Sequence, residues 1–228
     1  MDREVAPLVR DWPVADRELD GRRFRFYESR NAVVVCGGIG AESARRATEA
    51  VVRLYRPSHV QSVGLAGALD PRLKAGQIFC PRFVVDVRDG SRTDTGRGTD
   101  VLMSFPEIAS VAQKAKLARS YSAQAVDMEA AAVAKGASAH GLPFSALKAI
   151  SDESGFAMPP LNQFVNAEGK FKLANFVLYA SIRPWLWLRV IQLARNSARA
   201  AQALCLHLSR EMEVAGEAQS SLHPVGSR

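Results

Sequence analysis

The chain has 228 residues, 47% of them hydrophobic, and a formal net charge of +7 at pH 7. This length and hydrophobic content fit a single globular domain with a sizeable core. Charged and proline residues, Arg183, Pro184 and Arg189, interrupt its most apolar region, which excludes a predicted membrane span.

The N-terminus carries charged residues at 2–4, where the apolar core of a signal peptide would begin. Three dispersed cysteines, Cys36, Cys80 and Cys205, lie in apolar stretches and predict reduced thiols, not a disulfide framework. Neither they nor the four histidines have metal-ligand spacing. We therefore expect a cytoplasmic protein with no metal site and no cofactor.

The positive charge would suit an anionic partner such as a membrane surface, a phosphate or a nucleic acid. The arginines are spread along the chain, however, and no basic-aromatic motif accompanies them. A solvated, moderately basic surface is the simplest interpretation, and we expect no nucleic-acid partner.

Helical and strand-like segments alternate along the chain. Hydrophobic patterning predicts strands over 23–29, 32–37, 60–63, 78–87 and 101–105, a helix that opens at 37–40 and ends near 55, and a second helix over 107–120. A polar loop is expected over 89–100. This β/α alternation predicts an α/β fold, a single domain with a mainly parallel twisted sheet flanked by helices. We expect the domain to span 1–212, with an amphipathic helical segment over 171–210, and a disordered tail over 213–228.

Two short phrases each place a carboxylate after an apolar run. Glu129 lies in the phrase VDMEAAA that starts at Val126, and Asp152 lies in the phrase AISDE that starts at Ala149. The Ala-rich segment between them ends in Gly-Leu-Pro, a helix stop. Because ligands bind outside the carboxyl ends of strands in open α/β sheets, both acids are expected to meet at one site.

These phrases resemble the purine nucleoside phosphorylase and nucleosidase superfamily. The stretch VDMEAAAVAKGASAHGLPFSALKAISDES at 126–154 is similar to its signature half, closest to the methylthioadenosine and adenosylhomocysteine nucleosidases. The stretch at 33–81, from VVVCGGIGAES to AGQIFCP, resembles their strand, Gly-Ile-Gly turn, helix, strand and glycine-rich loop. The opening MDREVAPL resembles the segment that follows their first strand, and that strand is therefore expected to be missing from this chain.

The resemblance implies roles for individual residues in cleaving an N-glycosidic bond, with an oxocarbenium-like transition state. Asp152 matches the aspartate that protonates or hydrogen-bonds purine N7, and Ser151 lies beside it as an orienting group. Glu129 matches the glutamate that holds the ribose hydroxyls, and Glu4 the glutamate that orients and deprotonates the attacking water. The remaining candidates for substrate binding are Met128 against the sugar, Gly67 in the glycine-rich loop and Phe105 against the purine.

Simpler interpretations stand beside these roles. Asp152 can be a helix N-cap, Met128 and Phe105 can be core residues, and a charged residue such as Glu4 near a terminus is usually solvated. The turn at 37–40 lacks the third glycine of a dinucleotide fingerprint and fits a tight strand-to-helix connection.

Hydrolysis is favoured over phosphorolysis, because Leu65 stands where the family's phosphorylases carry Ser or Thr and an acid at position 4 would repel phosphate. We expect the protein to release adenine from an adenosine derivative. Its resemblance to homodimeric relatives also implies a homodimer. The segment 171–210 combines Trp and Arg in the manner of an interfacial helix, which resembles a hopanoid-associated branch acting on an adenosylated lipid, and implies a peripheral membrane contact. A non-catalytic adenine-nucleotide-binding protein or a peripheral membrane protein remains open.

Overall fold

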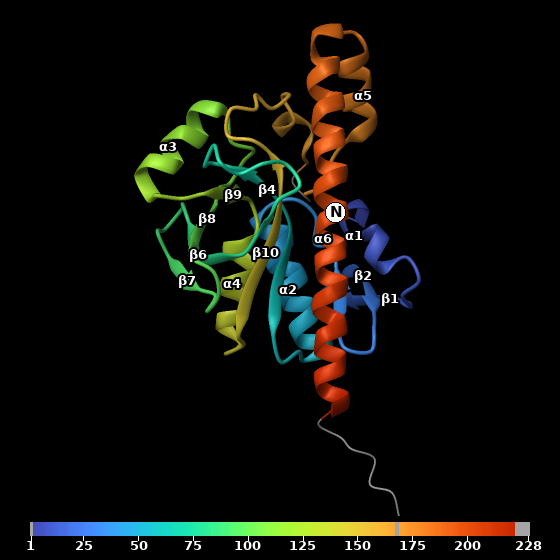
Figure 1. The fold of residues 1–228 in the computed structure, drawn as a ribbon. Helices are drawn as coiled ribbons and strands as arrows, with labels where there is room; N and C mark the ends of the chain where they lie inside the picture. Colours follow the sequence, from blue (N-terminus) through green and yellow to red (C-terminus); the bar gives the residue numbers. More distant parts are fainter. Residues whose placement is uncertain (1, 167–168, 222–228) are drawn as a thin grey trace, which may run out of the picture.

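The computed structural model describes residues 2–166 and 169–221 (Figure 1). Its elements in chain order are α1 (Asp2–Val9), β1 (Val14–Leu19), β2 (Arg22–Glu28), β3 (Val33–Val35), α2 (Ala41–Tyr55), β4 (Val60–Ala68), β5 (Ile78–Phe79), β6 (Pro81–Asp86), β7 (Arg92–Asp94), β8 (Asp100–Ser104), α3 (Val111–Tyr121), β9 (Ala125–Asp127), α4 (Ala130–Ala139), β10 (Phe144–Asp152), η1 (Asn162–Phe164), α5 (Leu173–Ser181) and α6 (Pro184–Ser221).

The main sheet has seven strands in the order β5-β10-β4-β9-β8-β6-β7. The pairings β10–β4, β6–β8 and β8–β9 are parallel, and they include the longest ladders. Antiparallel pairing is confined to short ladders made by β5, by β7 and by β9 with β4. The sheet is therefore mixed, and the expected single α/β domain built around a largely parallel sheet is confirmed.

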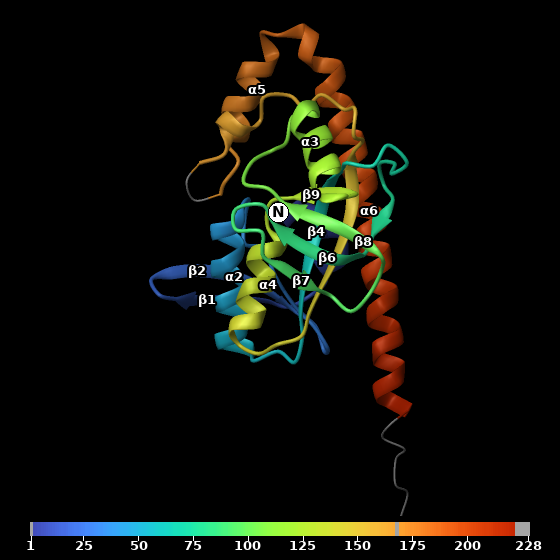
Figure 2. The same ribbon diagram turned by 90° about the vertical axis from the view of Figure 1, so that its left-hand side faces the viewer.

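Helices cover both faces of this sheet. Figure 2 shows α2 and α4 on one side and the long α6 on the other. Apolar residues of α4 and of the sheet, including Ala130, Ala134 and Ile150, form the larger core. On the opposite face, Leu204 and Leu208 of α6 pack against Leu147 of β10. Small alanines on α4 allow that helix to lie close to the strands that end in the signature acids.

The first three strands form a separate antiparallel sheet, β1-β2-β3. Within the described chain the first element is α1, and no strand precedes it. β4 pairs with β10 along most of its length, and with β9 only at Gly67 and Ala68. The sequence predicted that the first strand of the family would be missing from this chain, and the described residues contain no such strand before α1.

Several boundaries differ from the expected ones. The helix expected from 107 begins at Val111, because Ser110 and Gln113 form a capping box that fixes its start. The single strand expected over 78–87 is divided into β5 and β6, and the loop expected over 89–100 contains β7. α6 continues to Ser221, through part of the tail expected to be disordered from 213; its Ala, Glu and Gln residues favour a helix there. Residues 222–228 lie outside the described residues.

Candidate active site

Two strands flank one glycine at the end of β4: β10, which ends at Asp152, and β9, which leads to Glu129. Gly67 is the register partner of Asp152 on β10 and of Val126 on β9. Neighbouring strands lie about 4.8 Å apart, so the two acidic strand ends are separated by about 10 Å. A Cβ atom on Gly67 would lie 2.9 Å from Oδ2 of Asp152. A glycine is therefore needed where β4 passes between them.

Asp152 is fully buried at the end of β10 and is held by side chains alone. Its Oδ2 forms an ion pair with the ammonium of Lys114, and both side chains are 2% exposed. The hydroxyl of Ser151 donates to Oδ1 at 2.6 Å. Lys114 also donates to the carbonyl of Glu153 at 2.9 Å. No helix follows directly after Asp152, so its role is not that of an N-cap.

The sequence reasoning missed Lys114. It lies in the first turns of α3, whose start is fixed by the capping box at Ser110. In the sequence this lysine belongs to a polar, basic helix that reads as a solvated surface. No short-range pattern shows that its side chain reaches a carboxylate 38 residues further along the chain.

Glu129 stands directly before α4 but does not cap that helix with its side chain. Its Oε1 accepts a hydrogen bond from the backbone N–H of Gly40 at 2.7 Å, and its Oε2 one from Met128 at 3.2 Å. Burial raises the pKa of the Glu129 carboxyl to about 7; the charge of Asp127 adds to the rise, and Lys148 opposes it. Glu129 is thus poised to change protonation near neutral pH.

A second buried ion pair, which the sequence reasoning also missed, lies beside Glu129. Nζ of Lys148 is 2.9 Å from Oδ2 of Asp127 and donates to the hydroxyl of Ser62 at 3.0 Å. Asp127 accepts from the backbone N–H of Ala130 at 2.8 Å and from Ser104 Oγ at 2.6 Å. Asp127, not Glu129, therefore caps α4. A lysine inside an apolar strand was the available sequence signal, because buried lysines need a partner.

The glycine-rich turn connects β3 to α2 and supplies the donor for Glu129. Gly40 has φ 90° and ψ 164°, a conformation that only glycine adopts readily. Its N–H points to the Glu129 carboxylate at the N-terminus of α2, where the helix dipole favours a negative charge. The N–H of Ile39 donates to the carbonyl of Gly169 at 2.8 Å, so the segment leading to α5 closes over this turn.

Glu4, on α1, lies on the same side of β4 as Lys148. A Cβ atom on Gly64 would lie 3.5 Å from Oε2 of Glu4 and 3.8 Å from Nζ of Lys148. Both charged groups therefore approach one glycine in the middle of β4. The structure brings Glu4 towards Lys148.

The remaining sequence candidates differ in their surroundings. Met128 is partly exposed next to Glu129, whereas Phe105 packs against an apolar cluster that includes Met103 and Leu117. The backbone of Phe105 is tied to the signature strand, since its N–H donates to the carbonyl of Asp127 at 2.8 Å. Leu65, which stands where the family's phosphorylases carry Ser or Thr, packs with the cluster under α6.

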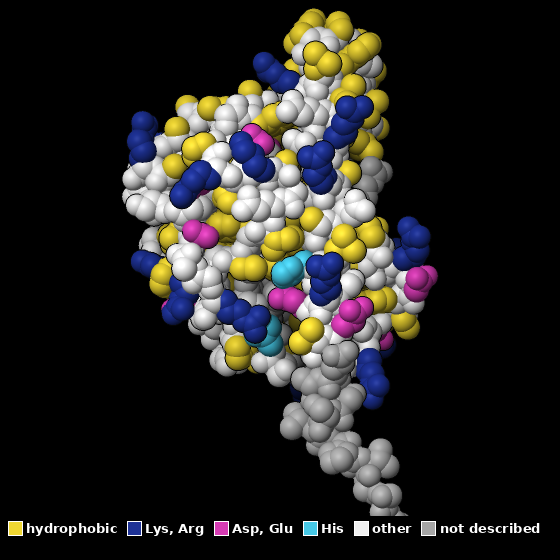
Figure 3. Space-filling view, in the orientation of Figure 1, with side chains coloured by type: hydrophobic (Ala, Val, Ile, Leu, Met, Phe, Trp, Pro, Cys, Tyr) yellow, Lys and Arg dark blue, Asp and Glu magenta, His cyan; other side chains and the backbone are white. Residues whose placement is uncertain are grey.

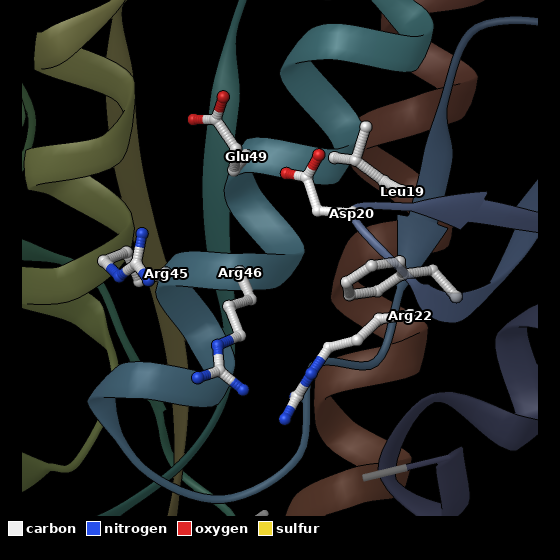
Figure 4. Close-up of a pocket in the computed structure, with 7 residues that line it drawn as sticks. Leu19, Asp20, Arg22, Arg45, Arg46 and Glu49 are labelled. Atoms are coloured by element: carbon white, nitrogen blue, oxygen red, sulfur yellow. The ribbon is translucent and has the colours of Figure 1, made fainter.

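A hollow of about 310 Å³ lies between the β1–β2 hairpin and α2 (Figure 4). Arginines, acids and two apolar side chains line it: Leu19, Asp20, Arg22, Phe24, Arg45, Arg46 and Glu49. Arg45 and Arg46 are already paired with Glu42, at 3.0 Å and 2.6 Å. None of the sequence-predicted site residues lines this hollow, and we assign it no part in the chemistry.

Within 2–166 and 169–221, no group of three or more His, Cys, Asp or Glu side chains is arranged to hold a metal ion. No helix in the described part of the chain is long and apolar enough to cross a membrane. The charged groups of the site are two carboxylate–ammonium pairs and two further carboxylates. Such a set can accept hydroxyl hydrogen bonds, move protons and stabilise a developing cation.

This fold and this set of strand-end acids define a known group of enzymes. The family model of the Phosphorylase superfamily matches residues 1–115 and 103–173, and the chain belongs to this superfamily. The family, the fold and the expected enzyme class, a nucleosidase or nucleoside phosphorylase, are thereby confirmed.

Individual relatives agree. A 5'-methylthioadenosine/S-adenosylhomocysteine nucleosidase of Marinomonas sp. (strain MWYL1) is 26% identical over 199 residues, which cover 70% of this chain and 85% of the relative. The structure of futalosine hydrolase of Helicobacter pylori strain 26695 superposes with a TM-score of 0.67 at 18% identity, covering 93% of this chain and 94% of that one. A 5'-methylthioadenosine/S-adenosylhomocysteine nucleosidase from Colwellia psychrerythraea 34H, in complex with adenine, gives a TM-score of 0.59 at 19% identity, covering 90% and 92%.

Proposed function

We propose that this protein hydrolyses the N-glycosidic bond of an adenosine derivative and releases adenine. The observation that carries the proposal is the placement of Asp152, at the end of β10, and of Glu129, between β9 and α4, with Gly67 of β4 paired to both strands. One acid then serves the leaving base, and the other serves the sugar. The relative from Marinomonas sp., a methylthioadenosine/adenosylhomocysteine nucleosidase, supports this substrate class.

The Asp152–Lys114 pair supplies the proton that the leaving base needs. When the bond between the anomeric carbon and N9 breaks, its electron pair moves into the purine, which then takes up a proton at N7. Lys114 passes its proton to the Asp152 carboxylate across their buried contact, Asp152 hands that proton to N7, and Lys114 is left neutral. Ser151 holds Asp152 Oδ1 and fixes the direction of the carboxylate.

Glu129 accepts hydrogen bonds from the ribose hydroxyls, and Met128 beside it packs against the sugar. These contacts strengthen in the transition state, because positive charge develops at the anomeric carbon. Glu4 orients the attacking water and takes its proton. The water oxygen forms the new bond to the anomeric carbon, and the proton later returns to Lys114 through solvent. Phe105 is proposed to lie along the purine.

The test is release of adenine from a panel of adenosine derivatives, with and without phosphate. Hydrolysis predicts adenine and a free sugar in phosphate-free buffer; a need for phosphate and formation of a sugar 1-phosphate would show a phosphorylase instead. Glu129→Gln should reduce activity on ribosides more than on 2'-deoxy substrates. A protein that binds adenine nucleotides but releases no adenine would refute the enzymatic proposal.

An adenosylated hopanoid lipid is a second candidate substrate. It is favoured by an exposed apolar hairpin, α5–α6, which follows the segment that closes over the Gly38–Gly40 turn. Comparison of methylthioadenosine with an adenosylated hopanoid in detergent tests it: a much higher kcat/KM for the lipid supports it, and cleavage of methylthioadenosine alone refutes it. We also propose a homodimer, which sedimentation equilibrium would measure.

A further inference from the structure

The outer end of the α5–α6 hairpin is covered by large apolar side chains. Val177, Leu178, Ile182, Trp185, Trp187 and Leu188 are each 50–80% exposed, and we call these six the tip. We propose that the tip docks on an anionic lipid membrane. The proposal concerns where the protein acts, and it does not depend on which bond the site cleaves.

The tip is a formed structure and not a frayed end. Nε1 of Trp187 donates to the carbonyl of Ala180 at 2.9 Å, which ties α6 to α5 across the connection. Phe176 of α5 and Leu186 of α6 are buried. At the base of the hairpin, Phe176 meets Phe164 edge to face, with ring centroids 5.4 Å apart. Because these contacts fix the hairpin, the six side chains of the tip are held largely exposed.

The charges along the hairpin are of one sign. Residues 169–210 contain seven Lys and Arg and no Asp or Glu. Lys172, Arg189 and Arg195 are exposed on the two helices that carry the tip. Figure 3 shows hydrophobic side chains gathered at the end of the hairpin, with Lys and Arg side chains further down.

This arrangement fits the boundary between lipid headgroups and acyl chains. Trp and Leu side chains can enter the acyl region, while cations one or two turns away remain at the depth of anionic headgroups. Neither helix is a candidate to cross the bilayer, so the contact is peripheral. The hairpin is basic and carries no acidic residue, so its charge is complementary to an anionic surface. A second copy of the same hairpin would carry the same positive charge and would not be complementary to it.

Docking at the tip also orients the candidate site. Figures 1 and 2 show β10 running towards the end of the molecule from which the hairpin projects. Asp152 closes β10, so this end of the site lies on the same side as the tip. A membrane-bound protein would therefore present the Asp152 end of its site towards the lipid surface.

Vesicle co-sedimentation of the full chain tests the proposal. Vesicles of phosphatidylcholine alone are compared with vesicles that contain 30% phosphatidylglycerol, on the order of a bacterial anionic surface. We expect binding that increases at least tenfold with the anionic lipid and falls as salt screens the cations. Trp185→Glu/Leu188→Glu should abolish binding. Leu206→Glu/Val214→Glu, which adds the same two charges at exposed apolar positions of α6 outside the tip, is the matched control and should bind as the wild type does.

Two further measurements make each outcome decisive. Circular dichroism and adenine release from a soluble substrate should be unchanged in the tip variant, because no tip residue belongs to the candidate site. If no variant, and not the wild type either, released adenine, the proposed activity would fail, but the vesicle-binding result would still test membrane docking. A wild-type protein that ignores all vesicles, or a tip variant that only dissociates a dimer in sedimentation, would overturn membrane docking.

Discussion

Asp127 and Asp152 end strands on either side of β4, and each forms a buried ion pair with a lysine. Their surroundings differ. Asp127 is also held by the backbone N–H of Ala130 and by the hydroxyl of Ser104, so it joins the sheet to the start of α4. Asp152 has only side-chain partners, Lys114 and Ser151. The same two residue types thus fix the fold at one strand end and leave a movable carboxylate at the other.

This difference in hydrogen-bond partners indicates which of the two carboxylates can take part in chemistry. A carboxylate that accepts from the backbone of α4 and from the Ser104 side chain of β8 cannot rearrange without disturbing both elements, whereas a carboxylate held by side chains can exchange a partner for a substrate. Breaking a buried pair by removing one partner leaves an uncompensated charge, so variants of either pair are best made with balanced charge.

The largest effect is expected for the charge-balanced variant Asp152→Asn/Lys114→Gln. Adenine release should fall by ~10²–10⁴, because an amide cannot hand a proton to N7. Steady-state kinetics measure the loss, and urea unfolding checks the fold. The matched control is Lys74→Gln/Glu153→Gln, which removes an exposed pair one residue further along the chain and should keep its activity.

Removal of the other lysine should act on stability. Lys148→Met leaves Asp127 buried without its cation and should lower the free energy of unfolding by about 3–5 kcal/mol. Urea denaturation measures this. Lys74→Met, which breaks the exposed pair with Glu153, should cost no more than about 1 kcal/mol. Equal losses in the two variants would contradict a structural role for the Asp127 pair.

Glu129 should make stability depend on pH. Its pKa rises on folding from 4.5 to about 7, so its stabilising contribution is present below about pH 4.5 and is lost as pH rises through 7. Relative to Glu129→Gln, the wild type should therefore lose up to about 3 kcal/mol of unfolding free energy between pH 5 and pH 8. Unfolding curves of both proteins over this range test it. A difference that stays constant with pH would show that the carboxyl is not perturbed.

The smallest effect is expected at the start of α3, which positions Lys114. Ser110→Ala removes the capping box and should cost about 1 kcal/mol of stability. Ser120→Ala, at an exposed position in the same helix, should cost nothing, since alanine is the better helix former. Thermal unfolding compares the two. A loss of activity in Ser110→Ala as large as that of the Asp152 variant would mean that α3 controls the site more strongly than the contacts indicate.

The sequence located the two acids because each follows an apolar run, and strand ends meet at one edge of an α/β sheet. The β/α alternation from Ala41 to Asp152 was also predictable, because its hydrophobic patterns are long and regular. α1 and β1 were not expected, because both are short and β1 is largely exposed.

The lysine partners could not be found from local patterns. Lys114 lies on a helix that reads as basic and solvated, and its contact with Asp152 exists only once α3 is placed against β10. Lys148 lies in an apolar strand, which indicates a buried charge but does not identify Asp127 as its partner. Gly40 was recognised as part of a turn, but its hydrogen bond to Glu129 depends on the packing of α2 beside α4.

The most direct test measures adenine release per folded molecule for both charge-balanced pairs in one assay. Asp152→Asn/Lys114→Gln should be folded and nearly inactive. Asp127→Asn/Lys148→Met should be less stable but should keep most of its activity in the molecules that remain folded. The reverse ranking, with the Asp152 variant active and the Asp127 variant folded but inactive, would contradict the assignment of chemistry to Asp152 and of structure to Asp127.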